Sequence, residues 1–452
     1  MANLKAVILA AGKGKRMNSD LQKVMHPILG KPMVQYVAEA AKQAGFDDVT
    51  VVVGKDSDEI VDGLAACGGL FFAVQSEPLG TAHAVLSGAG RISGNDDVIV
   101  LCGDMPLVTS EFIAELTAYY RASACAAVVA AVWREEMGDF GRVYDRDGDF
   151  IEIVEARDIT AAHGATNWGN TGIYVFKGEA LLHGLSQIRN ENSQNEYYLT
   201  DVPKILKDEG RVVRVFHTRE DMSVFTGINT QAHLAEAVSF MQKRNNERHM
   251  ANGVRMISPQ TVFVDGTVKI GRGAVIYPNV ILEGACEIAE NAVIGANTHL
   301  TSTAVGKGAF VRQSVAVDAK IGAGTEVGPF AYLRPGTEIG EQCKIGNFVE
   351  VKNSTIGDFT KMAHLAYIGD ADVGSGVNYG CGAITANYDG TKKHRTVIGD
   401  NVFIGSNSNL IAPVEIGASG FVAAGSTITE DLPPCALGIA RERQSVKLNW
   451  NG

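Results

Sequence analysis

The sequence VDGTVKIGRGAVIYPNVILEGACEIAENAVIGANTHL, residues 264–300, has an aliphatic residue at every sixth position. These positions are Val264, Ile270, Ile276, Leu282, Ile288, Ile294 and Leu300. A period of six fits neither an α-helix nor a strand with two alternating faces. It is typical of a parallel β-solenoid, in which each short strand turns one aliphatic side chain inward. We therefore predict a left-handed parallel β-helix of hexapeptide repeats.

The same count continues through most of the C-terminal half. After a one-residue slip it resumes at Val305, Val311 and Val317. It then returns at Ile321, Val327, Leu333, Ile339, Ile345 and Val351, and again at Ile398, Ile404, Leu410, Ile416, Val422 and Ile428. Three strands of about six residues complete one coil, and each coil adds one strand spacing of ~4.8 Å. Residues 264–428 should therefore form roughly nine coils.

Interruptions of the count divide into two kinds. One-residue slips at Val305, Ile356 and Val373 fit tightened corners of the solenoid. A larger break between Ile384 and Ile398 contains TANYDGTKKH, residues 385–394, which is polar and basic in an acidic protein. Insertions in solenoids form surface loops, often at a binding face, so this loop is a candidate site.

Composition sets the broad class of the protein. With 452 residues, 46% of them hydrophobic, the chain should form more than one globular domain. The net charge of −11 argues against a nucleic-acid-coating surface. Neither a run of about 18 apolar residues nor signal-peptide architecture is found. The seven cysteines are scattered without CxxC spacing, which indicates reduced thiols. We expect a cytoplasmic protein with no membrane or nucleic-acid partner.

The N-terminal half has a different pattern. Strand and helix signals alternate over residues 4–228, which favours a mostly parallel sheet covered by helices, with ligands at the carboxyl ends of strands. A helical stretch with Leu234, Ala237, Val238 and Met241 on one face follows, and Gly253 ends it. The predicted domains are residues 1–229, a linker helix at 230–252, and a β-helix domain with an irregular tail at 253–452.

A glycine-rich turn follows the first expected strand. Residues 9–17, LAAGKGKRM, combine small residues with cations, as in loops that bind phosphates through backbone N–H groups. The turn matches neither GxGxxG nor GxxxxGK[ST]. Taken alone it is equally compatible with a plain tight turn.

Three further segments support a nucleotide site. They are QSEPLGTAHA at 75–84, LCGDMP at 101–106 and FTGINT at 225–230. Asp104 and Asn229 offer the oxygen ligands that Mg²⁺ prefers. Each residue alone has a simpler interpretation: Asp104 as a turn residue, Asn229 as a helix N-cap and Lys23 as a surface lysine.

A second polar group lies on the solenoid between residues 334 and 409. His364 could deprotonate an amine, since histidine titrates near neutrality, and Arg334 and Lys352 suit phosphates. A histidine on a solenoid rung is, by itself, more often a corner residue. Its polar neighbours and Asn387-Tyr388 favour acyl transfer.

Together these motifs, with DFGRV at 139–143, NTGIY at 170–174 and NEYYLTDV at 195–202, resemble the sugar-nucleotidyltransferase (pyrophosphorylase) family. With the hexapeptide solenoid, the whole chain resembles the bacterial family that joins an N-acetylglucosamine-1-phosphate uridyltransferase to a glucosamine-1-phosphate N-acetyltransferase. The resemblance implies UTP and acetyl-CoA as co-substrates, Mg²⁺ as the metal, and a homotrimer with acetyl-transfer sites between neighbouring prisms.

The resemblance also implies roles in uridyl transfer. Uracil and ribose would be held by Leu9, Ala10, Ala11, Gly12, Gln75, Gly80 and Thr81. Arg16 and Lys23 would contact phosphates, and Asp104 and Asn229 would bind Mg²⁺. The N-acetylglucosamine moiety would be held by Gly141, Glu155 and Asn170. Cys102 and Gly103 complete the set, and Cys102 stands where the family commonly has Tyr.

For acetyl transfer the resemblance makes His364 the base. Glucosamine 1-phosphate would be bound by Arg334, Lys352, Tyr367 and Asn378. Acetyl-CoA would be bound by Cys381, Asn387, Tyr388, Ser406, Ala424 and Arg441. Cys381 stands where the family usually has Ala.

Two alternatives remain at this point. One is a single-function sugar-nucleotide pyrophosphorylase whose solenoid is structural or regulatory, which would have no need of His364 or Lys352. The other is a non-catalytic assembly subunit, which would be free to lose Arg16, Lys23 and Asp104. The interpretation we favour is the bifunctional enzyme.

Overall fold

The computed structural model describes residues 3–12, 14–138, 140–160, 163–192 and 194–450. It divides into two compact units, Met1–Met241 and Gln242–Gly452. Lys13, within the glycine-rich turn, lies outside the described residues.

Unit 1 is built on a nine-stranded sheet with the order β5-β4-β1-β6-β10-β7-β11-β9-β8. Its strands are β1 (Leu4–Leu9), β4 (Asp48–Val53), β5 (Leu70–Val74), β6 (Asp97–Cys102), β7 (Ala127–Trp133), β8 (Arg142–Arg146), β9 (Asp149–Val154), β10 (Trp168–Lys177) and β11 (Val213–Thr218). A separate pair is formed by β2 (Pro27–Ile28) and β3 (Lys31–Pro32).

The sheet is mixed, which corrects the expectation of a mostly parallel one. Strands β5, β4, β1 and β6 are parallel, as are β7 and β11. Strand β10 runs antiparallel between β6 and β7, and β8 and β9 form an antiparallel pair. The apolar run within β10 is buried on both faces in either direction, so hydrophobicity does not reveal which way the strand runs.

Helices cover both faces of this sheet and bury two apolar cores. One core includes side chains of α1 and α4, and the other includes side chains of α3, α5 and α6. The helices are α1 (Met33–Gln43), α2 (Asp58–Gly63), α3 (Thr81–Gly88), α4 (Ser110–Ala122), α5 (Gly178–Gln187) and α6 (Asp201–Asp208). Short 3₁₀ turns are η1 (Lys15–Met17), η2 (Lys23–Met25), η3 (Ala65–Cys67), η4 (Ala89–Arg91) and η5 (Met222–Phe225).

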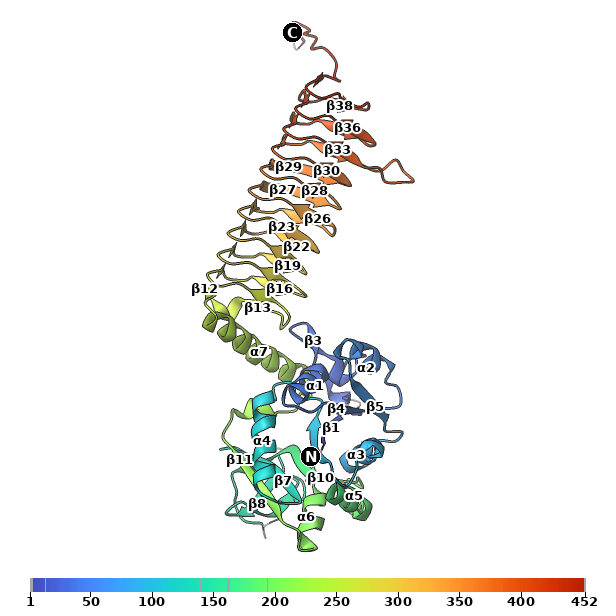
Figure 1. The fold of residues 1–452 in the computed structure, drawn as a ribbon, viewed down its shortest axis with the longest axis vertical. Coiled ribbons are helices and arrows are strands. Elements are labelled where there is room, and N and C mark those ends of the chain that lie inside the picture. The colour runs from blue at the N-terminus through green and yellow to red at the C-terminus, as the bar shows by residue number, and fades with distance from the viewer. Residues whose placement is uncertain (1–2, 13, 139, 161–162, 193, 451–452) are drawn as a thin grey trace. The chain divides into compact units, whose positions relative to one another are not determined.

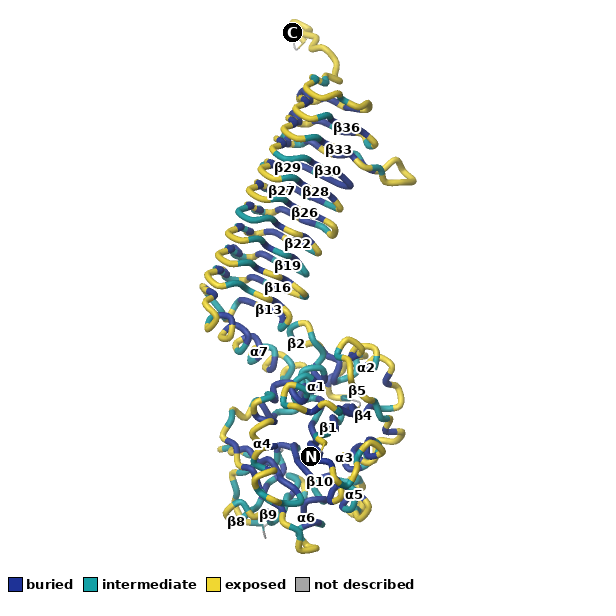
Figure 2. Tube along the Cα trace, viewed as in Figure 1, coloured by how far each residue is buried: buried dark blue, intermediate teal, exposed yellow. Residues whose placement is uncertain are grey.

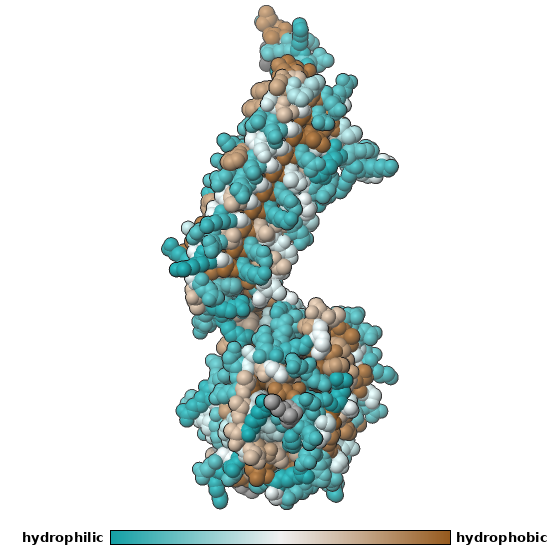
Figure 3. All heavy atoms as spheres, viewed as in Figure 1, coloured by the Kyte–Doolittle hydropathy of each residue, from teal (hydrophilic) through white to brown (hydrophobic). Residues whose placement is uncertain are grey.

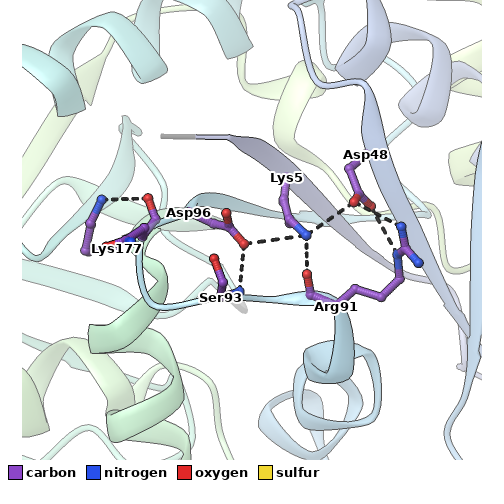
Figure 4. A network of polar contacts seen from close by, with 7 residues as sticks. Lys5, Asp48, Arg91, Ser93, Asp96 and Lys177 are labelled. Atoms are coloured by element: carbon purple, nitrogen blue, oxygen red, sulfur yellow. Dashed lines mark hydrogen bonds and ion pairs between the residues drawn. The ribbon is translucent and has the colours of Figure 1, made fainter. Parts of the chain in front are cut away.

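Charged side chains are paired at the amino ends of the central strands (Figure 4). Lys5 Nζ lies 3.3 Å from Asp48 Oδ2 and 3.5 Å from Asp96 Oδ2. The Ser93 backbone N–H donates to Asp96 at 2.7 Å, and Arg91 pairs with Asp48 at 3.1 Å. This end of the sheet is therefore internally neutralised.

Helix α7 (Gln231–Ala251) spans the boundary between the units. Its first half packs Leu234, Ala237, Val238 and Met241 into an apolar cluster of unit 1, as the sequence pattern predicts. In its second half the side-chain amides of Gln242, Asn245 and Asn246 donate to backbone carbonyls of unit 2. None of the described helices has the length and apolar content needed to cross a bilayer.

Unit 2 is a parallel β-helix whose rungs stack in register (Figure 1). Val264 pairs with Leu282, Ile270 with Ile288, and Ile276 with Ile294, so one coil takes 18 residues as predicted. The inward aliphatic side chains form one continuous core, visible as buried segments along the stack in Figure 2. The face formed by β14 to β36 has nine strands, matching the expected nine coils.

The strands fall on three faces, and β27 and β29 bend across the corner between two of them. The first face holds β12 (Arg255–Met256), β15 (Val275–Ile276), β18 (Val293–Ile294), β21 (Phe310–Val311), β24 (Glu326–Val327), β27 (Lys344–Lys352), β29 (Lys361–Gly369), β31 (Asn378–Tyr379), β34 (Phe403–Ile404), β37 (Phe421–Val422) and β39 (Leu437–Gly438). The second holds β13 (Phe263–Val264), β16 (Ile281–Glu283), β19 (His299–Thr301), β22 (Val315–Val317), β25 (Tyr332–Leu333), the later parts of β27 and β29, β32 (Ile384–Ala386), β35 (Asn409–Ile411) and β38 (Thr427–Ile428). The third holds β14 (Lys269–Ile270), β17 (Glu287–Ile288), β20 (Ala304–Val305), β23 (Ala319–Ile321), β26 (Thr337–Ile339), β28 (Thr355–Ile356), β30 (Ala371–Val373), β33 (Thr396–Ile398) and β36 (Val414–Ile416).

One member of the predicted repeat is wrong. The inward residue of β22 is Ala316, which is fully buried, whereas Val317 is only partly buried. Ala316 lies five residues from both Val311 and Ile321, so two tightened corners follow one another here. A small residue at the inward position gave no aliphatic signal, and the neighbouring Val317 supplied a false one.

The corners of the prism use left-handed backbone conformations. Asn, Gly, Ser and Asp occupy most of these positions, as expected for residues that tolerate positive φ. Three consecutive rungs instead place Phe330 (φ 60°), Phe348 (φ 58°) and Leu365 (φ 32°) at the corner between the first and second faces. All three side chains are exposed, and the two phenyl rings stack with centroids 5.5 Å apart. We call these three residues the apolar corner.

The predicted insertion is a loop between β32 and β33 that projects from the stack (Figure 1) and is largely exposed (Figure 2). Tyr388 and Lys393 form an antiparallel bridge within it. Asp389 accepts hydrogen bonds from the backbone N–H of Lys392 and of Thr391, both at 2.7 Å, and pairs with His394 at 2.7 Å. The donors, the Lys392 N–H first, lower the pKa of Asp389, so the loop is ordered around a carboxylate.

Candidate active sites

A cavity of about 280 Å³ opens at the carboxyl ends of β1 and β6. Ten residues predicted for the uridyltransferase site line it: Leu9, Ala10, Ala11, Gly12, Lys23, Gln75, Gly80, Thr81, Cys102 and Asp104. Val24, Pro78, Ala84 and Glu196 also line it and were not assigned from sequence. The first strand, the two segments at 75–84 and 101–106, and η2 therefore meet at one place.

Glycine allows close packing at two points of this cavity. Gly80 has φ 115°, and a Cβ there would lie 2.6 Å from the carbonyl oxygen of Tyr197. This close approach lets Thr81 Oγ1 accept the Leu199 N–H at 2.9 Å and Gln75 donate to the Gly80 carbonyl at 3.1 Å. At Gly103, whose N–H donates to the Leu9 carbonyl at 2.9 Å, a Cβ would lie 3.0 Å from that oxygen. Both glycines let chain segments pack closely around the cavity.

Lys23, Asp104 and Asn229 form one polar cluster at the mouth of the cavity. Lys23 Nζ lies 2.5 Å from Asp104 Oδ2 and 3.1 Å from Asn229 Oδ1. Two oxygens from distant parts of the chain thus converge on a single cation, which fits the predicted oxygen-ligand site. Within the described part of the chain no group of three or more His, Cys, Asp or Glu could hold a metal. A metal here would take its remaining ligands from substrate and water. Arg16 lies exposed on η1 nearby in the chain.

Cys102 ends β6 beside Asp104. Its Sγ lies 3.8 Å from the carbonyl oxygen of Gly172, and loss of solvent raises the pKa of the thiol to about 12, with the negative charge of Asp104 acting in the same direction. Cys102 is therefore a neutral thiol at physiological pH, where it serves as a small packing group.

The predicted sugar-binding residues lie together. A Cβ at Gly141 would lie 3.4 Å from Glu155 Oε2 and 3.6 Å from Asn170 Cβ. Tyr174, not predicted from sequence, exchanges hydrogen bonds with the Asn170 amide at 2.8 and 3.0 Å. Burial raises the pKa of Glu155, with Asp158 and Asp201 contributing, although a hydrogen bond from Thr200 opposes the shift. A carboxyl and a fixed amide suit the recognition of sugar hydroxyls and an acetamido group.

A longer groove of about 840 Å³ runs along the third face of the β-helix. Its floor contains Gly271 and Gly306, where a Cβ would lie 2.6 Å from the backbone nitrogens of Glu290 and Ala323 in the next rung. Glycine is found at these positions because the rungs stack too closely for a larger residue. Since the floor is apolar and regular, we assign the groove to packing and place the chemistry elsewhere.

The second site begins with a cationic cluster on the second face and the insertion loop. Lys393 lies against Lys352 and lowers its pKa, Arg334 adds to this effect, and Asp370 opposes it. Arg334 Nη1 also donates to Glu350 Oε1 at 2.9 Å. Lys393 was not assigned from sequence, although its loop was. Adjacent ammonium groups lose their mutual repulsion when an anion binds between them, which suits a phosphate.

His364 lies on the same strand as Tyr367, directly before the corner residue Leu365 that joins the first and second faces. Its Nδ1 is 2.9 Å from Asn347 Oδ1, and the two residues are register partners on β29 and β27. Asn347 therefore accepts the Nδ1–H, which leaves Nε2 of the neutral ring available to take a proton. Asn347 was missed because the role depends on its place one rung below His364.

Four of the six predicted acetyl-CoA residues continue from His364 as a column up the same corner: Cys381, Ser406, Ala424 and Arg441. His364, Cys381, Ser406 and Ala424 each precede the left-handed corner residue of successive rungs: Leu365, Gly382, Asn407 and Gly425. Arg441 continues this column, since a Cβ at Gly425 would lie 3.8 Å from its Cδ. Tyr388 is exposed on the insertion loop, and its hydroxyl donates to the Gly390 carbonyl at 2.6 Å.

Asn387 and Asn378 also lie apart from this column. Asn387 is buried beside Asp370, to which its side-chain amide donates, so it lies closer to the cationic cluster. Asn378 lies on the first face, where it pairs with Lys361 of β29 and Phe403 of β34, whereas Lys352 and Tyr367 lie on the second-face parts of β27 and β29. Within a single chain, Asn378 therefore lies on a different face from the other predicted sugar-phosphate residues.

Comparison with known proteins divides the sequence into the same two parts. Residues 6–194 match the MobA-like NTP transferase domain model, and residues 267–302, 318–353 and 395–430 match the bacterial transferase hexapeptide model. The bifunctional protein GlmU of Clostridioides difficile (strain 630) is 42% identical over 99% of this chain and 97% of its own length. The proteins of the same description from Listeria monocytogenes serotype 4a (strain HCC23) and Shouchella clausii (strain KSM-K16) are 43% and 44% identical, over 100% and 98% of this chain and 98% of each relative.

Proposed function

This chain belongs to the bifunctional GlmU family and is an acetyltransferase and a uridyltransferase, and we propose that the two reactions occur at the two sites described above. Acetyl-CoA acetylates the amine of glucosamine 1-phosphate at the solenoid. UTP then reacts with N-acetylglucosamine 1-phosphate at the sheet, giving UDP-N-acetylglucosamine and pyrophosphate. The single-function alternative is not favoured, since relatives cover both halves of the chain.

At the sheet the sugar phosphate oxyanion attacks the α-phosphorus of UTP. A new P–O bond forms, the bond to the β-phosphate oxygen breaks, and pyrophosphate leaves. The attacking anion needs no base, so the side chains act by positioning and by neutralising charge. Lys23 and Arg16 would bind the phosphates, and Glu155 and Asn170 would hold the sugar. Asp104 and Asn229 would hold Mg²⁺, which when bound supplies positive charge to the triphosphate.

At the solenoid His364 Nε2 would accept the proton of the sugar ammonium. The amine nitrogen then bonds to the acetyl carbon and gives up its second proton, the carbon–sulfur bond breaks, and the coenzyme leaves as a thiolate that takes up a proton. Asn347 orients the imidazole through Nδ1, while Lys352, Lys393 and Arg334 would bind the sugar phosphate. The observation that supports this assignment most directly is the hydrogen bond of 2.9 Å between His364 and Asn347.

The acetyl-transfer unit would be a homotrimer, with each site between two prisms. The apolar corner supports this proposal, because exposed Phe and Leu at left-handed positions incur both backbone strain and exposed apolar surface. It lies next to His364 and Asn347. Figure 3 also shows apolar side chains along the visible side of the β-helix. The placement of Asn378 on another face is compatible with its serving a neighbouring chain's site.

The two-site assignment is tested by comparing His364→Ala with Asp104→Ala. We expect His364→Ala to reduce thiol release from acetyl-CoA by about 10²–10⁴-fold while uridylation of supplied N-acetylglucosamine 1-phosphate stays intact. Asp104→Ala should do the reverse. Circular dichroism of both variants controls for unfolding. Equal damage to both reactions in well-folded variants would refute the assignment.

A further inference from the structure

The Lys23 ammonium occupies the position at which the oxygens of Asp104 and Asn229 converge. It lies 2.5 Å from one oxygen and 3.1 Å from the other. The Lys23 side chain is only 11% exposed and that of Asp104 18%. A charge with this little access to water is held mainly by its protein partner.

The surrounding backbone fixes this arrangement. Gly14 is left-handed (φ 59°), and a Cβ there would overlap Lys23 Cβ, so the stem of the lysine packs directly on the glycine-rich turn. The Asn229 amide group donates to the Gly227 carbonyl at 3.0 Å, which turns its oxygen towards Lys23. A Cβ at Gly227 would lie 3.1 Å from Asp104 Oδ2. The two oxygens and the lysine are thus positioned by three separate segments.

We propose that Lys23 and a divalent cation exclude each other at Asp104 and Asn229, so that the lysine keeps the metal position filled until nucleotide arrives. This inference rests on the metal assignment of the proposed function and extends it. A divalent cation needs the same two oxygens at close range, and one carboxylate cannot neutralise both cations. The lysine therefore has to leave before the metal binds.

Lys23 can leave readily only if another anion receives it. The triphosphate of UTP is such an anion, since Lys23 lines the cavity proposed for it. Nucleotide binding would then draw Lys23 away and leave the oxygens of Asp104 and Asn229 free for the metal. Metal binding would in turn displace Lys23 and make its ammonium available to the triphosphate. The two ligands bind cooperatively, and by linkage each strengthens the other by the same factor.

The test measures binding of Mn²⁺ alone to the full-length, nucleotide-free protein, with free Mn²⁺ followed by electron paramagnetic resonance. Lys23→Met keeps an unbranched stem but removes the ammonium from Asp104. Lys15→Met is the matched control, because Lys15 is an exposed lysine of the same turn region, on η1, with no assigned role. The double variant Lys23→Met/Asp104→Asn tests where the metal binds.

We expect Lys23→Met to bind Mn²⁺ at least about tenfold more tightly than wild type, because a competing cation has been removed. Lys15→Met should remain within about twofold of wild type, and the double variant should lose the gain. Equal affinities of Lys23→Met and Lys15→Met would overturn the exclusion. A gain that survives in the double variant would place the metal elsewhere and overturn the metal assignment itself. Thermal unfolding of each variant controls for loss of structure.

Discussion

Replacing Phe348 by asparagine should separate the proposed trimer without unfolding the β-helix. Phe348 is 57% exposed, so about 110 Å² of a side chain of roughly 200 Å² is open to a partner. At ~25 cal/mol per Å², burying this surface contributes about 3 kcal/mol per copy to association, or more than a hundredfold.

The same substitution should have little effect on the folding of the single chain. Phe348 has φ 58°, a conformation that costs a bulky residue roughly 1–2 kcal/mol and that asparagine adopts more readily. The loss of its stacking on Phe330 removes about 0.5–1.5 kcal/mol. These two effects largely cancel, so the free energy of unfolding of the β-helix should change by less than about 1 kcal/mol.

Sedimentation velocity over a range of protein concentrations measures the association, and the two activities are assayed on the same samples. We expect dissociation at concentrations where wild type is trimeric, loss of acetyl transfer, and unchanged uridyl transfer. Phe359→Asn is the matched control: Phe359 is 62% exposed at φ 60°, but on a different corner. A Phe348→Asn protein that stays trimeric and fully active in acetyl transfer would refute the reasoning.

Two further predictions concern single hydrogen-bonded groups. Asn347→Ala should lower kcat of acetyl transfer about 3- to 10-fold, since one hydrogen bond worth about 0.5–1.5 kcal/mol orients His364. Steady-state kinetics checks this, with uridyl transfer expected to stay unchanged, and an unaltered kcat of acetyl transfer would contradict it. Asp96→Asn should lower the free energy of unfolding by about 1–3 kcal/mol at pH 7, because the nearly buried carboxylate accepts the Ser93 N–H and pairs with Lys5. These contacts lower the pKa of Asp96 even though burial alone would raise it, so its stabilisation is fully present above the unfolded-state pKa of about 3.9 and is lost as the pH falls through the lower folded-state value. Urea unfolding of wild type and variant should therefore converge at acidic pH, and a gap that persists there would exclude this origin.

Much of the β-helix could be predicted because its rule is local. Each short strand needs one inward aliphatic side chain, so the residue at every sixth position reports the fold directly. The rule failed at Val317, where two short corners and a small inward residue, Ala316, broke the period. It also gave no warning of the apolar corner, because Phe330, Phe348 and Leu365 recur at corner positions that carry no inward side chain.

The position of the nucleotide cavity could also be predicted from a general rule. In a sheet of this kind the carboxyl ends of neighbouring strands meet, so segments after β1 and β6 could be expected at one place. The direction of β10 could not be read from its apolar residues, and Glu196 carried no signal of its own.

By itself, the sequence determined the two kinds of fold, the loop that interrupts the second, and the candidate chemistry of each half, because these depend on period, composition and residue type. The tertiary structure alone decided which groups meet. It placed Asn347 under His364, Lys393 against Lys352, and Lys23 between Asp104 and Asn229. The physical reason is that hydrogen bonds and charge pairs act over a few ångströms, whereas these partners are separated in the chain by 17 to 206 residues.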